Sequence, residues 1–155
     1  MKNYVKFAVA AAVLAVPFEA SAVTGDVIFN GTVSNTCSIV VDNAGSMTTN
    51  VGQTVLGSAQ AGGAAGQATV TTTSGAYSVS IDAVTAFDTA PVGGGTNVTF
   101  ASDYSGSGDT TIASTSGTSA LNTGATVVSV NLAATKSSGS FPSGTYSATA
   151  VLRCE

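Results

Sequence analysis

The chain has 155 residues, of which 44% are hydrophobic and 8% are charged, and its formal net charge is −4. This acidic balance argues against nucleic acid or an anionic membrane as a partner, because both are bound by clustered Lys and Arg. Histidine is absent, which excludes a His-based triad, a histidine general base and a histidine-ligated zinc site. We therefore expect no enzyme, no metal ion and no cofactor, although the scattered carboxylates leave a hydrolase as a remote alternative.

The first 22 residues have the pattern of a cleaved secretion signal. Two lysines precede an apolar run over residues 7–16, and residues 20–22 (Ala-Ser-Ala) match an A-x-A cleavage site. The alternative, a membrane anchor, is disfavoured because the run is shorter than the ~20 residues that span a bilayer. We expect residues 1–22 to be removed, so that an exported, soluble chain of 133 residues begins at Val23.

Residues 23–37 alternate as an extended strand does. One face of this strand would carry Val23, Gly25, Val27, Phe29, Gly31 and Val33. An apolar, alternating strand at the start of an exported chain needs a partner, and the pattern does not say whether that partner is its own chain or another. Cys37 ends the stretch.

The rest of the chain is rich in Gly, Ser, Thr, Ala and Val, which favours strands and turns over helices. After residues 38–41 we expect a polar turn at 42–45 and a loop at 58–67. Further strands are predicted at 68–73, 77–82, 97–101 and 125–133, with mostly loop between 105 and 124. The last predicted strand, 144–155, places Tyr146, Ala148, Ala150, Leu152 and Cys154 on one face. About seven short strands around one core predict an all-β fold, an immunoglobulin-like β-sandwich.

The chain has two cysteines, Cys37 and Cys154. Two cysteines in an exported protein most often form one bridge, so we expect a Cys37–Cys154 disulfide that brings the first and last strands together. The alternatives are two unpaired thiols or a cross-link between subunits.

Three stretches resemble the subunits of chaperone–usher pili, in particular the archaic type related to spore coat protein U. The first is A-V-T-G-D-V at the cleavage site, followed by the alternating strand and a cysteine. The second is A-T-V-T-T-T-S-G-A-Y-S-V-S-I-D (68–82), and the third is the closing G-T-Y-S-A-T-A-V-L-R-C-E (144–155). Two positions depart from the family: threonine stands near Thr72 where a second cysteine is usual, and Arg153-Cys154-Glu155 replaces an aromatic end.

The resemblance implies a mechanism for the unpartnered strand. Such subunits are incomplete immunoglobulin-like sandwiches that lack their last strand, and they polymerise by β-augmentation. The donor strand would be 23–30, with Val23, Gly25, Val27 and Phe29 entering a neighbour's groove, and 31–155 would form the sandwich. Gly31 would be the joint, and Gly31 to Cys37 the first strand of the sandwich. The groove would be lined partly by the last strand through Tyr146, Ala148, Ala150 and Leu152.

The resemblance also implies partners and a location. A periplasmic chaperone and an outer-membrane usher would handle the subunit before it joins neighbouring subunits in a fimbria on the cell surface, with roles in adhesion and biofilm. In the family the C-terminal carboxylate anchors on the chaperone, a role that would fall to Glu155. The alternative is a monomeric secreted or cell-surface binding or coat module.

Overall fold

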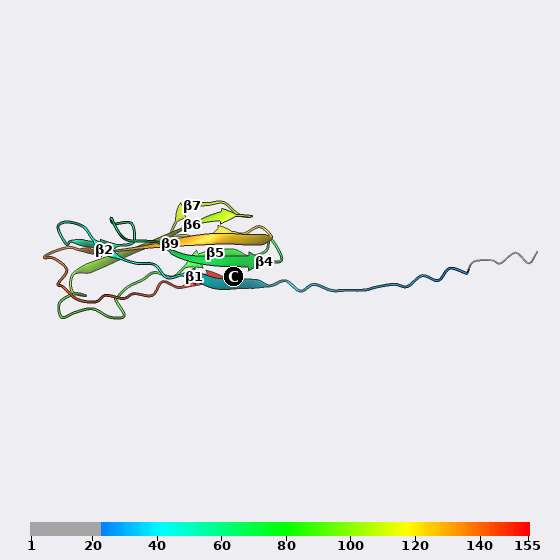
Figure 1. Cartoon of the computed structure of the whole chain (residues 1–155), viewed down its shortest axis with the longest axis horizontal. Helices are drawn as coiled ribbons and strands as arrows, with labels where there is room; N and C mark the ends of the chain where they lie inside the picture. The colour runs from blue at the N-terminus through cyan, green and yellow to red at the C-terminus, as the bar shows by residue number, and fades with distance from the viewer. Residues whose placement is uncertain (1–22) are drawn as a thin grey trace, which may run out of the picture. The chain divides into compact units, whose positions relative to one another are not determined.

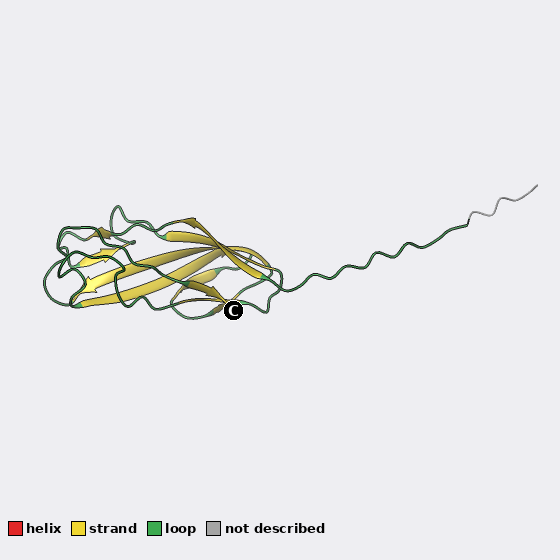
Figure 2. Cartoon of the chain, turned by 90° about the horizontal axis from the view of Figure 1, so that it is seen from below, coloured by secondary structure: helices red, strands yellow, loops and turns green. Residues whose placement is uncertain are grey.

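The computed structural model describes residues 23–155, and among them only strands and loops occur (Figure 2). Residues 33–155 form one compact unit, and residues 23–32 lie outside it. The expected signal peptide, 1–22, lies outside the described residues. The prediction of an all-β sandwich is confirmed. Within the described part no helix is long and apolar enough to cross a membrane.

Ten strands build the two antiparallel sheets of the unit 33–155 (Figure 1). They are β1 (Cys37–Asn43), β2 (Thr48–Thr49), β3 (Val55–Gly57), β4 (Gly66–Thr72), β5 (Ser78–Ile81), β6 (Val98–Gly108), β7 (Ile112–Thr115), β8 (Ser119–Ala120), β9 (Gly124–Lys136) and β10 (Leu152–Cys154).

The larger sheet is built on β9, its longest strand. One edge of β9 pairs with β6 along the whole of β6, and β7 then extends the sheet beyond β6. The other edge pairs with β4 in its first half and with β3 near its end. β1 is added outside β4, so β1 is an edge strand of this sheet. The smaller sheet has the order β10-β5-β8.

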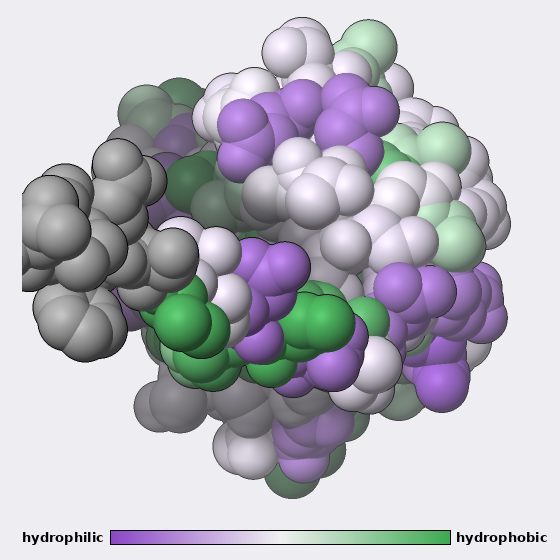
Figure 3. Space-filling view, turned by 90° about the vertical axis from the view of Figure 1, so that its right-hand side faces the viewer, coloured by the Kyte–Doolittle hydropathy of each residue, from purple (hydrophilic) through white to green (hydrophobic). Residues whose placement is uncertain are grey.

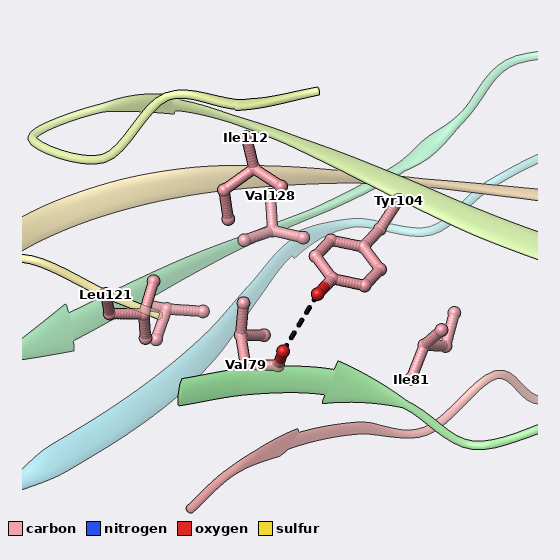
Figure 4. Close-up of a cluster of buried hydrophobic side chains, with 7 residues drawn as sticks. Val79, Ile81, Tyr104, Ile112, Leu121 and Val128 are labelled. Atoms are coloured by element: carbon pink, nitrogen blue, oxygen red, sulfur yellow. Dashed lines mark hydrogen bonds between the residues drawn. The ribbon is translucent and has the colours of Figure 1, made fainter. Parts of the chain in front are cut away.

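The two sheets enclose an apolar core whose centre is Tyr104 of β6 (Figure 4). Tyr104 is fully buried, and its hydroxyl donates to the carbonyl oxygens of Val79 (2.8 Å) and Gly117 (2.7 Å). The core around it is completed by Val70, Val79, Ile81, Ile112, Leu121 and Val128. A buried phenol needs such acceptors, because a buried polar group without a partner is costly. These apolar side chains are therefore buried, and the Tyr104 hydroxyl among them has hydrogen-bond partners.

Two strand predictions are wrong. The sandwich does not begin with a strand over Gly31 to Cys37: residues 31–36 have no regular structure, and β1 starts at Cys37 and extends into the expected turn as far as Asn43. The stretch 105–124 is not mostly loop, because β6 extends to Gly108 and β7 and β8 follow. The small residues of this stretch have a low intrinsic preference for strands. They form a strand where β6 pairs with β9, because the hydrogen bonds of the β6–β9 ladder stabilise it.

The last predicted strand is shorter than expected. Regular pairing is confined to β10, with one isolated bridge between Ser147 and Thr89. The predicted alternation is nevertheless present in the burial, since Ala148, Ala150 and Leu152 are half-buried and Thr149 and Val151 are exposed. The segment before β10 is therefore extended but largely unpaired.

Candidate functional site

An apolar groove opens along the edge of the sandwich, between β1 and the last residues of the chain. Its volume is about 460 Å³. One wall is formed by Ile39 and Val41 of β1, and the opposite wall by Ala148, Ala150 and Leu152. We call this space the edge groove.

Both walls of the edge groove have backbone without a partner. In the described part of the chain β1 pairs with a single strand, β4, so its other edge is unpaired. On the opposite wall, no backbone hydrogen bond joins Ala148, Thr149 or Ala150 to another described strand. Unpaired strand edges of this kind are templates for pairing with a further strand.

The floor of the edge groove is apolar and comes from the centre of the larger sheet. Ala68 of β4 and Val130 and Leu132 of β9 line it. The one buried hydroxyl there, Ser58, is satisfied, since its Oγ donates to Asn131 Oδ1 (3.0 Å) and accepts from the Leu132 backbone N–H (3.1 Å). Among the described residues no buried side-chain polar atom lacks a partner. The groove therefore suits an apolar occupant rather than a polar small molecule.

The predicted disulfide is confirmed and lies at one end of the edge groove. It joins Cys37, the first residue of β1, to Cys154, the last residue of β10, with a Cα–Cα distance of 6.3 Å. The bridge spans a sequence separation of 117 residues. The chain-entropy model assigns a loop of this size about 4–5 kcal/mol, a model-dependent upper value. The bridge fixes how far apart the two walls lie at this end.

A second hollow adjoins the other end of the edge groove. It has a volume of about 690 Å³, and Gly45, Ser46, Met47 and Ala148 line both spaces. Tyr146 lines this second hollow and not the edge groove. Its pKa is raised by burial, and its hydroxyl donates to the carbonyl oxygen of Pro142 (2.8 Å).

Tyr146 belongs to an aromatic cluster. Its ring packs edge-on against Phe87 (5.1 Å between centroids) and Phe141 (5.6 Å), and Phe87 packs against Phe100 (4.8 Å). Such edge-to-face pairs stabilise by about 0.5–1.5 kcal/mol each beyond their buried area. Of the four residues predicted to line the groove, three line its wall. The fourth, Tyr146, packs in the aromatic cluster beside the groove.

Residues 23–33 have no strand pairing, and their apolar side chains are exposed. Phe29 is 91% exposed and Val27 is 76% exposed. No atom lies within 4 Å of a Cβ placed on Gly25 or Gly31. In Figure 3 strongly hydrophobic and hydrophilic surface stand directly beside each other on the face turned to the viewer. We call residues 23–33 the N-terminal segment.

Glu155 continues the pairing of β10 with β5. Its backbone N–H donates to the Ser78 carbonyl (3.0 Å), and its carbonyl accepts from the Ser78 N–H (2.7 Å).

Near Glu155, Arg153 donates two hydrogen bonds to the carboxylate of Asp82, at 2.6 and 2.7 Å. This ion pair lowers the pKa of Asp82 through the hydrogen bond and raises that of Arg153. Within residues 23–155 no three acidic, Cys or His side chains gather as a metal site requires.

One wall and the floor of the edge groove were not predicted from the sequence. Ile39 and Val41 share a face with Cys37, so continuing the alternation past the cysteine would have found them. The floor residues are ordinary core residues by pattern, and nothing local marks them as uncovered. No known family model matches this chain, and neither does any curated protein or solved structure.

Proposed function

We propose that this protein is a structural subunit that polymerises by strand donation, the N-terminal segment of one copy filling the edge groove of the next. The observation that carries the proposal is the coexistence, in one chain, of an apolar groove with two unpaired walls and an exposed, alternating apolar segment. Each feature is costly alone, and each supplies what the other lacks.

The dimensions of the two parts agree. Residues 23–30 span about 26 Å when extended, at roughly 3.3 Å per residue. β1, which forms one wall, has seven residues and is therefore of similar length. A strand in the groove would pair its backbone with β1 on one side and with residues 148–150 on the other.

The apolar side chains of the donor supply the driving force. Phe29 and Val27 are largely exposed and would be covered by the groove. Burying one such side chain is worth about 1.5–3 kcal/mol, to which the new backbone hydrogen bonds add. Asp26 and Asn30 alternate with these residues and would face solvent.

The same proposal includes an assembly route. A free groove exposes core residues, so a periplasmic chaperone would cover it until an outer-membrane usher brings the next subunit, and the product would be a fimbria outside the cell. Glu155, exposed beside β5, is the residue we assign to the chaperone contact. No catalytic step is involved. The competing function is a monomeric secreted or surface module, in which the edge groove would stay open.

The test is to refold the mature chain, residues 23–155 with its disulfide intact, at increasing concentration. Light scattering and unboiled SDS gels then measure polymer. We expect a concentration-dependent ladder for the natural sequence. Phe29→Asp should reduce it strongly, because the groove would have to bury a charge.

Ile28→Asp is the matched control. It introduces the same charge one residue away, on the face of the strand that would point to solvent, so the ladder should persist. A chain that stays monomeric at every concentration supports the monomeric module instead. Equal loss of polymer in both variants would also contradict the proposal, because a docked strand distinguishes its two faces.

A further inference from the structure

The N-terminal segment contains the one asparagine of the chain that is followed by a glycine. Asn30 and Gly31 are both exposed, and they lie in residues 23–36, which have no regular structure. No atom lies within 4 Å of a Cβ placed on Gly31. Among the described residues, neither the Asn30 side chain nor the Gly31 N–H has a hydrogen-bond partner. The side-chain amide and the backbone nitrogen that follows it are therefore both free to move.

Two groups placed in this way can react with each other. The backbone nitrogen of Gly31 attacks Cγ of Asn30, and the new C–N bond closes a succinimide ring. The bond from Cγ to the side-chain nitrogen breaks, and that nitrogen leaves as ammonia with the proton of the Gly31 N–H. Water then opens the ring at either carbonyl: its hydroxyl adds to the carbonyl carbon and its proton goes to the ring nitrogen. The product is aspartate or isoaspartate, and in isoaspartate the backbone runs through one additional carbon.

We propose that Asn30–Gly31 is a site of spontaneous deamidation, which alters the N-terminal segment while it is free and which docking of the segment prevents. The part that concerns docking rests on the proposed function. Ring closure requires the backbone at Asn30 to turn until the next nitrogen meets the side chain. Glycine offers no Cβ that would oppose this turn, and no strand pairing holds the segment extended.

The other asparagines lack one or both of these conditions. Asn35 is exposed in the same irregular stretch, but the next residue is the β-branched Thr36, whose N–H donates to Thr73 Oγ1 (2.8 Å). The remaining described asparagines also precede residues other than glycine, and their side chains are held by hydrogen bonds: Asn43, Asn50, Asn97, Asn122 and Asn131. A free side chain and an unhindered nitrogen meet at position 30.

Docking removes the freedom that the reaction needs. In a paired strand ψ is near about +135°, the backbone N–H groups lie in the plane of the sheet, and the side chains stand out of that plane. Asn30 is the last residue of the donor strand 23–30, so docking would hold its backbone in this form. The Gly31 nitrogen then cannot reach Cγ of Asn30. The extent of modification therefore depends on how long a copy remains undocked.

The two products differ in their effect on later docking. Aspartate keeps the backbone unchanged and places its charge on the face that would point to solvent. Isoaspartate moves the carbonyl at position 30 away from its place in the ladder, because the backbone passes through the former side chain. Loss of one backbone hydrogen bond should weaken association roughly two- to tenfold. A segment that stays free for long thus becomes a poorer donor.

The test follows the mature chain, residues 23–155 with its disulfide intact, at mildly alkaline pH, where the Gly31 nitrogen loses its proton more readily. One sample is kept dilute as free chain and another is first allowed to polymerise. Peptide mapping by mass spectrometry measures conversion at positions 30 and 35, and the isoaspartate and aspartate peptides are separated by chromatography. We expect conversion at Asn30 in the free chain, little conversion at Asn35, and loss of most of the Asn30 conversion in the polymer.

Gly31→Val is the matched variant. Its branched side chain hinders the approach of the nitrogen, so most of the conversion at Asn30 should be lost. After ageing as free chain, the natural sequence should associate more weakly than fresh chain by the factor given above. Aged Gly31→Val should associate as well as fresh Gly31→Val does, a comparison that is independent of any effect of the substitution itself.

The other outcomes separate this inference from the proposed function. Absence of conversion at Asn30, or equal conversion at Asn35, would overturn the modification site. Equal rates in the free chain and in the polymer would overturn the protection by docking, and unchanged association of the isoaspartate form would overturn its consequence. Absence of polymer from fresh natural chain would contradict the proposed function instead, while conversion at Asn30 in the free chain would still establish the modification site.

Discussion

The sandwich has a closed region and an open one, and both are built from the same two sheets. Around Tyr104, between β5 and the β6–β9 pair, a cluster of apolar side chains is buried and the phenol has its acceptors. Along the edge groove, β1 and residues 148–152 face each other across a space that no described residue fills. What distinguishes the regions is that the backbone edges beside the groove, those of β1 and of residues 148–150, have no hydrogen-bond partner among the described residues.

This difference concerns backbone as much as side chains. The groove walls have unpaired strand edges, and its polar floor residue is already satisfied. A small molecule would cover the apolar surface but leave the strand edges unpaired. A strand would do both, which is why we favour a strand as the occupant.

The largest expected effect is in the closed region. Tyr104→Ala should lower the free energy of unfolding by about 3–5 kcal/mol, because it leaves a cavity at the centre of the core. Chemical denaturation of the monomer measures this. Tyr104→Phe separates the hydroxyl from the ring and should cost about 1–3 kcal/mol, since Val79 and Gly117 then lose their donor.

The stability of the Tyr104→Ala variant can also be measured in the polymer. The closed region gains nothing from a further strand, so the loss should be the same in monomer and polymer. A loss that shrinks on polymerisation would mean that the core around Tyr104 is itself incomplete without the neighbour.

Sequence patterns predicted the closed region unevenly. The alternation of β4, β5 and β9 was readable because one face of each strand is buried. The first part of β6 was predicted as 97–101, but its continuation was not, since residues 105–108 are Ser and Gly and form a strand only because β9 supplies a matching ladder. Tyr104 was missed as the core centre for the same reason.

The open region was predicted through the chain ends. The disulfide followed from counting cysteines, and three groove residues followed from the alternation before Cys154. The start of β1 was misplaced because the alternation continues from Val23 past Cys37 with few exceptions, so the pattern alone does not mark where pairing begins. Whether a face is covered depends on the arrangement of both sheets, which no local pattern encodes.

An intermediate effect is expected at the groove wall. Val41 lines the groove and is 73% exposed, so Val41→Ala should change monomer stability by no more than about 0.5 kcal/mol. In the polymer the same change should cost about 1–1.5 kcal/mol of association, because the lost methyl groups would contact the donor. Monomer denaturation and the concentration dependence of light scattering measure the two values.

Val40→Ala is the matched control for Val41. Val40 is the neighbouring residue on β1, is also exposed (59%), and does not line the groove. It should leave both stability and association nearly unchanged. If Val40→Ala weakens association as much as Val41→Ala does, the two faces of β1 are equivalent and the groove is not the docking surface.

The smallest effect is expected at the Arg153–Asp82 ion pair, which lies on the exposed face of the β10–β5 pair. The hydrogen bond from Arg153 lowers the pKa of Asp82 below its ordinary value of 3.8. A carboxyl whose pKa is lower in the folded state stabilises the fold above its unfolded pKa, and this contribution is lost as the pH falls through the folded value. Asp82→Asn should therefore lower Tm slightly at pH 6–7, and the difference should disappear as the pH falls below 3.8 and through the lowered pKa of Asp82. Because the pair is exposed, 1 M NaCl should also remove most of the difference.

Asp26→Asn, which removes the same charge from the N-terminal segment, should leave Tm unchanged throughout. A Tm difference that persists at low pH would show that Asp82 acts through something other than its charge. The ion pair joins β10 to the residue after β5 and does not line the groove. The pH dependence of Tm that it causes should therefore be the same in the polymer as in the monomer.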